Sequence, residues 1–231
     1  MCSRPPRAMT PLRFSQLPTL AMLVVAVHTA TVRPAAAQAA SSPPPLTGLA
    51  GAIAKARADS ARLPYVKADI EFMSTMIHHH AQAIVMAKWA PTHGANPEVQ
   101  RLCERIVNAQ TDEIALMSRW LEARSQRVPV PNPAGMTMQM GGMEHTMLMP
   151  GMLTEDQMRE LDAARGAAFD RLLLTGMIQH HRGAVSMVKE LFTAYGAAQD
   201  ETVFKFANDV EVDQTTEITR MFQMLLTIGA P

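Results

Sequence analysis

One eleven-residue pattern occurs twice in this chain and constrains its fold more than any other feature. Residues 76–86 read MIHHHAQAIVM and residues 177–187 read MIQHHRGAVSM, so both contain Met-Ile-x-His-His-x-x-Ala-x-x-Met, at an offset of 101 residues. Asp69 and Asp170 precede the two copies at the same offset. A helix turns by about 100° per residue, which puts the aspartate, the first methionine, the second histidine and the alanine of each copy on one stripe. The repeat predicts two amphipathic helices with histidine on the buried side.

The two copies differ at the position before the histidine pair. His78 stands there in the first copy and Gln179 in the second. This position lies about 180° from the stripe, so we expect it to face water. Histidine is therefore repeated where each helix faces inward and varies where the helix faces outward.

A second repeat follows each copy. Residues 110–117, QTDEIALM, align with residues 214–221, QTTEITRM, at an offset of 104. They lie in helices expected at about 97–124 and 200–227, whose apolar stripes each include one glutamine and one glutamate. Together with a first helix at about 65–89, these patterns indicate that the repeated unit is a helical hairpin.

A long segment separates the two hairpins. Residues 125–153 are rich in Pro, Gly and Met, and Thr154 with Gln157 forms a capping box at the start of a third helix, expected over about 155–195. We expect Gly166 and Gly183 to weaken that helix without ending it. A connection of this length can run back along a helix of about 25 residues. The chain is therefore predicted to be all-α, a ferritin-like four-helix bundle with one long crossover.

The first 37 residues are expected to be a signal peptide. Three arginines precede an apolar run at 17–27, and an Ala-x-Ala cleavage site follows at 35–37. This segment holds four of the 21 basic residues and none of the 21 acidic ones, so the mature chain has a net charge of −4. That charge gives no indication of a nucleic-acid partner. With no stable membrane anchor left after cleavage, we expect a periplasmic or secreted protein.

The rest of the chain divides into a linker and one domain. Residues 38–64 are expected to form a Pro/Ser/Ala linker and a loosely attached helix. Residues 65–231 form the bundle domain, with hairpins at 65–124 and 154–231 and the Met-rich crossover at 125–153. Of the 231 residues 48% are hydrophobic but only 5% aromatic, so the core must be aliphatic and rich in methionine. Cys103, the only cysteine left after cleavage, lies on an apolar stripe and is expected to be a small buried hydrophobe.

Folded in this way, the hairpins bring a layer of polar side chains to the bundle axis. Unpaired groups at that depth cost about 1–3 kcal/mol each, so they must bind one another, water or a ligand. Two histidine pairs with methionine one turn away favour a metal over satisfied core histidines. The Glu-x-x-His motif of di-iron bundles is absent, and imidazole with thioether suits copper, as Cu(I) or Cu(II). The ligands indicated by this reasoning are Met76, His79, His80, Met177, His180 and His181. The side chains expected to orient them are Asp69, Gln110, Glu113, Asp170, Gln214 and Glu217.

The crossover carries an independent signal. Residues 136–152 read MTMQMGGMEHTMLMPGM, and a flexible, glycine-containing segment does not need so many thioethers for packing. One interpretation is a loose Cu(I)-binding loop, and the other is an adaptable cover for the bundle or for a partner surface. The residues of this possible loop site are Met136, Met138, Met140, Met143, His145, Met147, Met149 and Met152.

The repeated motif resembles a known family. Residues 149–157 (MPGMLTEDQ) and 169–187 (FDRLLLTGMIQHHRGAVSM) are similar to the family called domain of unknown function 305, which is ferritin-like and includes periplasmic copper-binding proteins. The resemblance extends from about residue 65 to the C-terminus, and His78 departs from the family pattern. It implies an exported bundle whose candidate copper ligands are Met76, His79, His80, Met86, Met177, His180, His181 and Met187.

Three functions agree with these features. The first is copper sequestration or delivery in the periplasm or outside the cell. The second is a metal- or haem-dependent oxidoreductase with its centre between the histidine-bearing helices, and the third is a metal-free interaction bundle. No additional acid/base or nucleophile motif is visible, which favours binding over an enzyme.

Overall fold

The computed structural model describes residues 48–60 and 65–228, so the expected signal peptide and most of the linker lie outside the described residues. The elements are α1 (Gly48–Ser60), α2 (Lys67–Lys88), α3 (Pro97–Glu122), β1 (Met136–Met140), β2 (Met143–Met147), α4 (Glu155–Ala163), α5 (Gly166–Thr193) and α6 (Glu201–Ile228).

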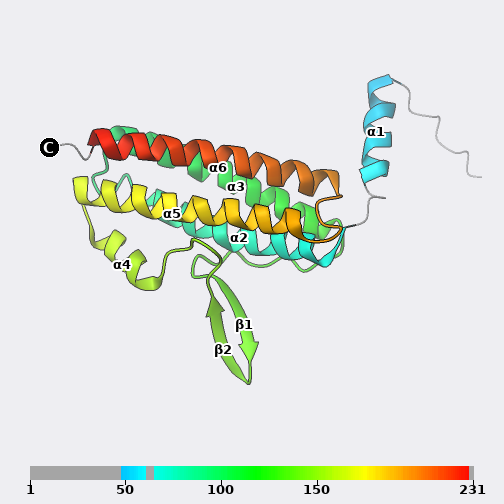
Figure 1. The fold of residues 1–231 in the computed structure, drawn as a ribbon, viewed down its shortest axis with the longest axis horizontal. Helices are drawn as coiled ribbons and strands as arrows, with labels where there is room; N and C mark the ends of the chain where they lie inside the picture. The colour runs from blue at the N-terminus through cyan, green and yellow to red at the C-terminus, as the bar shows by residue number, and fades with distance from the viewer. Residues whose placement is uncertain (1–47, 61–64, 229–231) are drawn as a thin grey trace, which may run out of the picture. The chain divides into compact units, whose positions relative to one another are not determined.

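Four long helices form a bundle (Figure 1). α2 packs against α3 in one antiparallel hairpin, α5 against α6 in the other, and the hairpins meet through α2 and α5. At the start of α3, the Asn96 side chain accepts a hydrogen bond from Glu98 N at 2.9 Å, and Pro97 takes the first helical position, which needs no N–H donor. The predicted helical bundle of two hairpins is confirmed.

The starts of α2 and α5 are each held by the turn of the opposite hairpin. Asp69, in the first turn of α2, accepts a hydrogen bond from Ala198 N at 2.7 Å. Asp170, near the start of α5, accepts one from Asn96 N at 3.1 Å. These two bonds join the hairpins at both ends, with α2 and α5 antiparallel.

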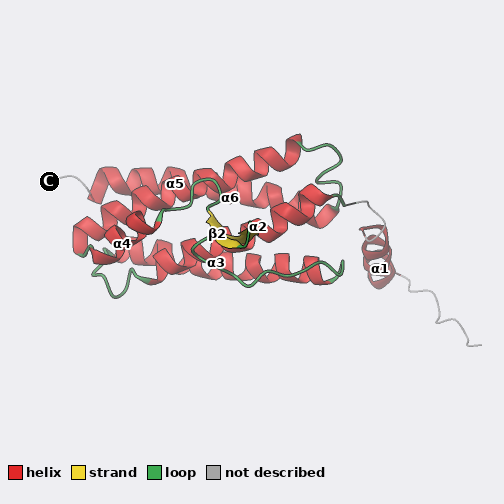
Figure 2. Ribbon diagram, turned by 90° about the horizontal axis from the view of Figure 1, so that it is seen from below, coloured by secondary structure: helices red, strands yellow, loops and turns green. Residues whose placement is uncertain are grey.

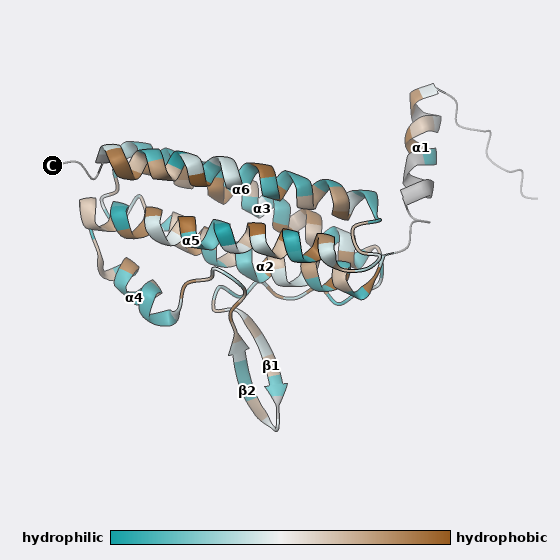
Figure 3. Ribbon diagram, in the orientation of Figure 1, coloured by the Kyte–Doolittle hydropathy of each residue, from teal (hydrophilic) through white to brown (hydrophobic). Residues whose placement is uncertain are grey.

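The core consists of two apolar clusters with a polar layer between them. Along α2, Phe72, Met73, Met76 and Ile77 belong to one cluster and Ala83, Met86 and Ala87 to the other, with the histidines in between. Each of the other three helices also passes through both clusters, which are separated by buried histidine on α5 and by Gln110 and Gln214 on α3 and α6. Figure 3 shows hydrophobic and hydrophilic residues alternating along α5 and α6.

The prediction of one continuous helix over 155–195 is wrong. α4 ends at Ala163 and α5 begins at Gly166, whose φ is +55°. The Gly166 N–H donates to the carbonyl oxygen of His93 at 2.8 Å, and His93 Nε2 lies 3.0 Å from Asp162 Oδ1. The Gly166 N–H is therefore bonded to the turn between α2 and α3, and not to a carbonyl of α4 as it would be in a continuous helix.

The crossover returns along the bundle, as predicted, but it is not a structureless loop (Figure 2). β1 and β2 pair antiparallel through the two-residue turn Gly141–Gly142, whose φ angles of 61° and 81° suit a hairpin turn that requires positive φ. The Met-rich segment is thus largely a β-hairpin, which the all-α prediction did not include.

Candidate metal centre

Four histidines lie fully buried at the middle of the bundle. His79 and His80 come from α2 and His180 and His181 from α5, and each has 0% exposure. We call these four residues the histidine layer. The rings of His79 and His180 lie closest across the two helices, with centroids 3.8 Å apart.

Two of these rings bind backbone carbonyls. His180 Nε2 donates to the carbonyl oxygen of His79 at 2.9 Å, and His79 Nε2 donates to that of Pro150 at 3.0 Å. A carbonyl oxygen only accepts, so the hydrogen of each neutral ring is on Nε2. The Nδ1 atom of each ring is left with a free lone pair.

The other two rings face carboxylates on α6 and α3. His181 Nε2 donates to Glu217 Oε2 at 2.6 Å. His80 Nε2 lies 2.7 Å from Glu113 Oε2, but this pair lacks the alignment of a hydrogen bond. Glu113 and Glu217 thus stand where the sequence placed them, beside the histidines. A carboxylate in this position orients the ring and raises its basicity.

All four Nδ1 atoms lack a hydrogen-bond partner among the described residues. They belong to a larger set of buried, unpartnered polar atoms in this layer, which includes the amide of Gln110 and Oε1 of Gln214. Each such atom costs about 1–3 kcal/mol unless something binds it. Four buried imidazole lone pairs are donors that suit a transition metal.

Burial also keeps part of this layer neutral. Desolvation, and after it the neighbouring His80, lowers the pKa of His79 to about 3. Desolvation, followed by His79, lowers the pKa of His180 well below its usual range. The neutral ring is the form that binds a metal, so both are ready to coordinate at neutral pH.

Methionines flank the histidine layer on both sides. Met76 and Met187 lie in one apolar cluster, and Met86 and Met177 in the other, all of them buried. Among the described residues, no three His, Cys, Asp or Glu side chains converge on one point. A metal held here therefore requires thioether ligands or a small movement of the imidazoles.

The thiol of Cys103 is not suited to this role. The side chain is buried, and desolvation, then the charge of Asp170, raises its pKa to about 12. A thiol in that environment stays protonated at neutral pH and does not become the thiolate that metals prefer. It packs in the apolar cluster with Met86, in agreement with the expected buried hydrophobe.

Asp69 and Asp170 do not support the histidine layer. Each lies ten residues before the first layer histidine of its helix, about 15 Å along the axis. Their carboxylates bind the turns at the bundle ends, and burial raises the pKa of Asp170. Their repeat spacing therefore marks a structural contact between the hairpins.

The expectation that His78 faces water is wrong. Its side chain is buried, and its Nδ1 accepts a hydrogen bond from Asn132 N at 3.1 Å. The crossover covers this side of α2, so desolvation lowers the pKa of His78. Gln179 is exposed, and its amide donates to the carbonyl of Gly151 at 3.3 Å.

Gln82 and Gly183 position the crossover over the layer, a role that the sequence pattern did not predict for either residue. Gln82 donates to the carbonyl of Leu153 at 2.9 Å and accepts from its N–H at 2.7 Å. Its repeat counterpart is Gly183, where an added Cβ would lie 1.8 Å from the carbonyl oxygen of Pro150. We call residues 149–153 the strap. The contrast between Gln82 and Gly183 at equivalent positions is the signal that could have revealed it.

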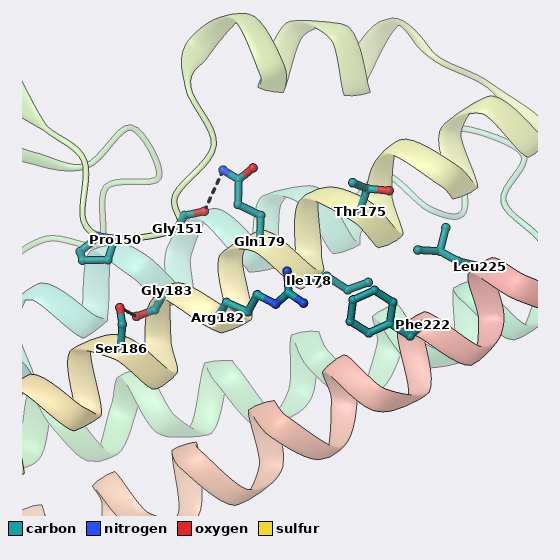
Figure 4. A pocket seen from close by; sticks show the side chains of 10 residues that line it. All are labelled: Pro150, Gly151, Thr175, Ile178, Gln179, Arg182, Gly183, Ser186, Phe222 and Leu225. Atoms are coloured by element: carbon teal, nitrogen blue, oxygen red, sulfur yellow. Dashed lines mark hydrogen bonds between the residues drawn. The ribbon is translucent and has the colours of Figure 1, made fainter.

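A pocket of about 690 Å³ lies on the outer side of α5 beside the strap (Figure 4). Its lining includes Gln179, Gly183 and Arg182, whose guanidinium lies 5.2 Å from the centroid of the Phe222 ring. None of the four layer histidines lines it. This pocket is therefore separate from the candidate metal centre.

Known proteins share the fold and part of the sequence. Residues 69–225 match the family described as Domain of unknown function (DUF305). A crystal structure of a DUF305 protein from Streptomyces coelicolor, described as a candidate secreted protein, is 29% identical with a TM-score of 0.59, over 71% of this chain and 94% of that one. CopM in its Cu(II)-bound form is 31% identical with a TM-score of 0.54, over 69% of this chain and 96% of that one. CopM structures also include Cu(I)-bound and Ag-bound forms.

Another relative matches a smaller part of the chain. The uncharacterized protein L153 of Acanthamoeba polyphaga mimivirus is 34% identical over 56 residues, which are 24% of this chain and 37% of that protein. The chain thus matches little more than a third of that relative's length. Within the described ranges, no helix is both long enough and apolar enough to cross a bilayer.

Proposed function

This chain belongs to the family of domain of unknown function 305, and from that premise we propose that it is an exported protein that binds copper in the histidine layer. The metal would be cargo, held for sequestration or delivery without turnover. The candidate ligands are the Nδ1 atoms of His79, His80, His180 and His181. The thioethers of Met76, Met86, Met177 and Met187 lie in the clusters on either side.

One observation carries the proposal: four buried Nδ1 atoms without a partner, in rings whose Nε2 atoms face acceptors. A layer built only to fix helix register would pair these nitrogens with other side chains. Imidazole with nearby thioether favours copper over magnesium or calcium, which prefer oxygen ligands.

The relatives support the same metal. CopM has been solved with Cu(I), Cu(II) and Ag, and it covers more than two thirds of this chain. Export rests on the predicted signal peptide at 1–37 and agrees with the description of the Streptomyces coelicolor relative. The site would therefore meet copper in the periplasm or outside the cell.

The test is copper retention by residues 38–231 after loading with Cu(I) under ascorbate. The substitutions His79→Gln and His180→Gln, made together, keep a donor near the Nε2 position for the two carbonyl acceptors and remove Nδ1. His78→Gln is the matched control, because it installs the residue found at the equivalent position of the second repeat.

We expect the double variant to lose the tightly bound copper and the control to keep it. Retention of all copper by a folded double variant would contradict the proposal and indicate that the histidine layer has a structural role only.

A further inference from the structure

The β-hairpin sorts its side chains by chemistry onto two faces. Met136 pairs with Met147 and Met138 with His145, while Thr137 pairs with Thr146 and Gln139 with Glu144. Directly paired residues project to the same side of an antiparallel ribbon, and successive residues alternate. Met143 therefore lies on the side of His145 and Met147. We call this side the methionine face; its described side chains are Met136, Met138, Met143, His145 and Met147.

The methionine face is largely open to solvent. Met138, Met143 and Met147 are 39%, 64% and 49% exposed, and His145 is also exposed. Thioethers at such exposure contribute little to a core. Cβ atoms of paired residues lie about 4.5–5.5 Å apart, so the thioether of Met138 and the imidazole of His145 can reach one ion. Thioether ligands select soft cations such as Cu(I).

The base of the hairpin adjoins a pocket that reaches the strap. This pocket, of about 480 Å³, is lined by Met136 and Met147 of the hairpin and by Met149 and Met187. Glu71 and Glu190 also line it and favour a cation. Pro150, a further lining residue, accepts the hydrogen bond from His79. Methionines thus continue from the exposed hairpin to the strap that covers the layer.

We propose that the methionine face is a second site, for a soft monovalent cation of the Cu(I) class, which captures the metal at the surface and passes it to the histidine layer. The transfer exchanges thioether ligands for imidazole nitrogens, and the oxidation state of the metal does not change. The destination rests on the proposed function, whereas the capture site rests on the hairpin alone.

The test compares three forms of residues 38–231. The hairpin variant carries Met138→Leu, Met143→Leu and His145→Gln, which keep side-chain size but remove the soft donors. The matched control carries Thr137→Val, Gln139→Thr and Thr146→Val on the opposite face. Bound Ag(I) is counted by calorimetric titration, and the rate of copper uptake is followed by transfer from a coloured Cu(I) chelator.

We expect the hairpin variant to bind one Ag(I) fewer than the unmodified protein and to take up copper more slowly, with its final content in the bundle unchanged. The control should match the unmodified protein in both measurements. An unchanged Ag(I) count or an unchanged uptake rate in the hairpin variant would overturn the proposal. Failure of the bundle site would appear separately, as copper retained by the His79→Gln, His180→Gln variant.

Discussion

The imidazole of His180 is bonded through Nε2 to the backbone carbonyl of His79, 2.9 Å away on the neighbouring helix. The bond joins α2 to α5 at the level where both helices carry an unpartnered Nδ1. The acceptor is the backbone carbonyl of His79. The bond therefore orients the His180 ring without using the imidazole of His79. Metal binding at Nδ1 would leave this bond intact.

The carboxylates behind the layer should contribute unequally to metal binding. His181 donates a well-aligned hydrogen bond to Glu217, whereas His80 and Glu113 are close but misaligned. Glu217→Leu should lower copper affinity by about 10–100-fold, the usual effect of removing a group that orients a ligand. Glu113→Leu should lower the copper affinity by a smaller factor. Competition with a Cu(I) chelator measures both, and exposed Glu104→Leu is the control. Equal losses would show that hydrogen-bond alignment is not what matters.

The stability of the metal-free protein should fall with pH below about 6.5. The folded state keeps His79 neutral down to a pKa of about 3, and the pKa of His180 is also lowered, whereas both rings in the unfolded chain take up protons near pH 6.5. The unfolded state therefore binds more protons in this window, and the free energy of unfolding declines by about 1.4 kcal/mol per pH unit for each ring.

Urea unfolding of the apo protein between pH 7.5 and 5 measures this slope. The His79→Gln, His180→Gln variant should show a flatter dependence. The same slope in both proteins would show that groups other than His79 and His180 cause the pH dependence of the unfolding free energy.

Gly183→Ala should dislodge the strap. The new Cβ would lie 1.8 Å from the carbonyl oxygen of Pro150, which also accepts the hydrogen bond of His79. Overpacking of this kind costs about 1–3 kcal/mol, which outweighs the gain of up to about 1 kcal/mol in helix propensity. Thermal unfolding measures the net effect. Gly176→Ala is the comparison, because its Cβ would lie 3.0 Å from a side-chain carbon of the strap residue Leu153 rather than against strap backbone, so it should destabilise the protein less.

Removing either end aspartate should reduce stability and leave metal binding intact. Asp69→Ala deprives the amide of Ala198 of its acceptor, and Asp170→Ala does the same to Asn96. Each loss should cost about 1–3 kcal/mol. Copper content of the folded variants, measured beside their unfolding free energies, separates the two roles. Loss of copper from a folded Asp69→Ala protein would show that Asp69 contributes to metal binding after all.

The repeats were sufficient to predict the bundle because helix period and hairpin order are local properties. α2, α3 and α6 begin and end close to the expected residues, and Glu113 and Glu217 stand beside the histidines. The break before Gly166 was not predictable from its neighbours, because the carbonyl that takes its N–H belongs to His93. Burial of His78 likewise depends on Asn132 in the crossover, far away in sequence. The β-hairpin could have been predicted, because Gly141–Gly142 lies between two segments in which apolar and polar residues alternate, which is a signal for a hairpin turn.

The contacts at the two bundle ends are exchanged between the two halves of the chain. Asp69 of the first half binds the turn of the second, and Asp170 of the second half binds the turn of the first. Either half alone would lack a partner for its carboxylate and for its turn amide, and a second copy of that half would supply both. The two halves are thus arranged as the protomers of a twofold homodimer of one helical hairpin would be, with the crossover as the covalent connection between them.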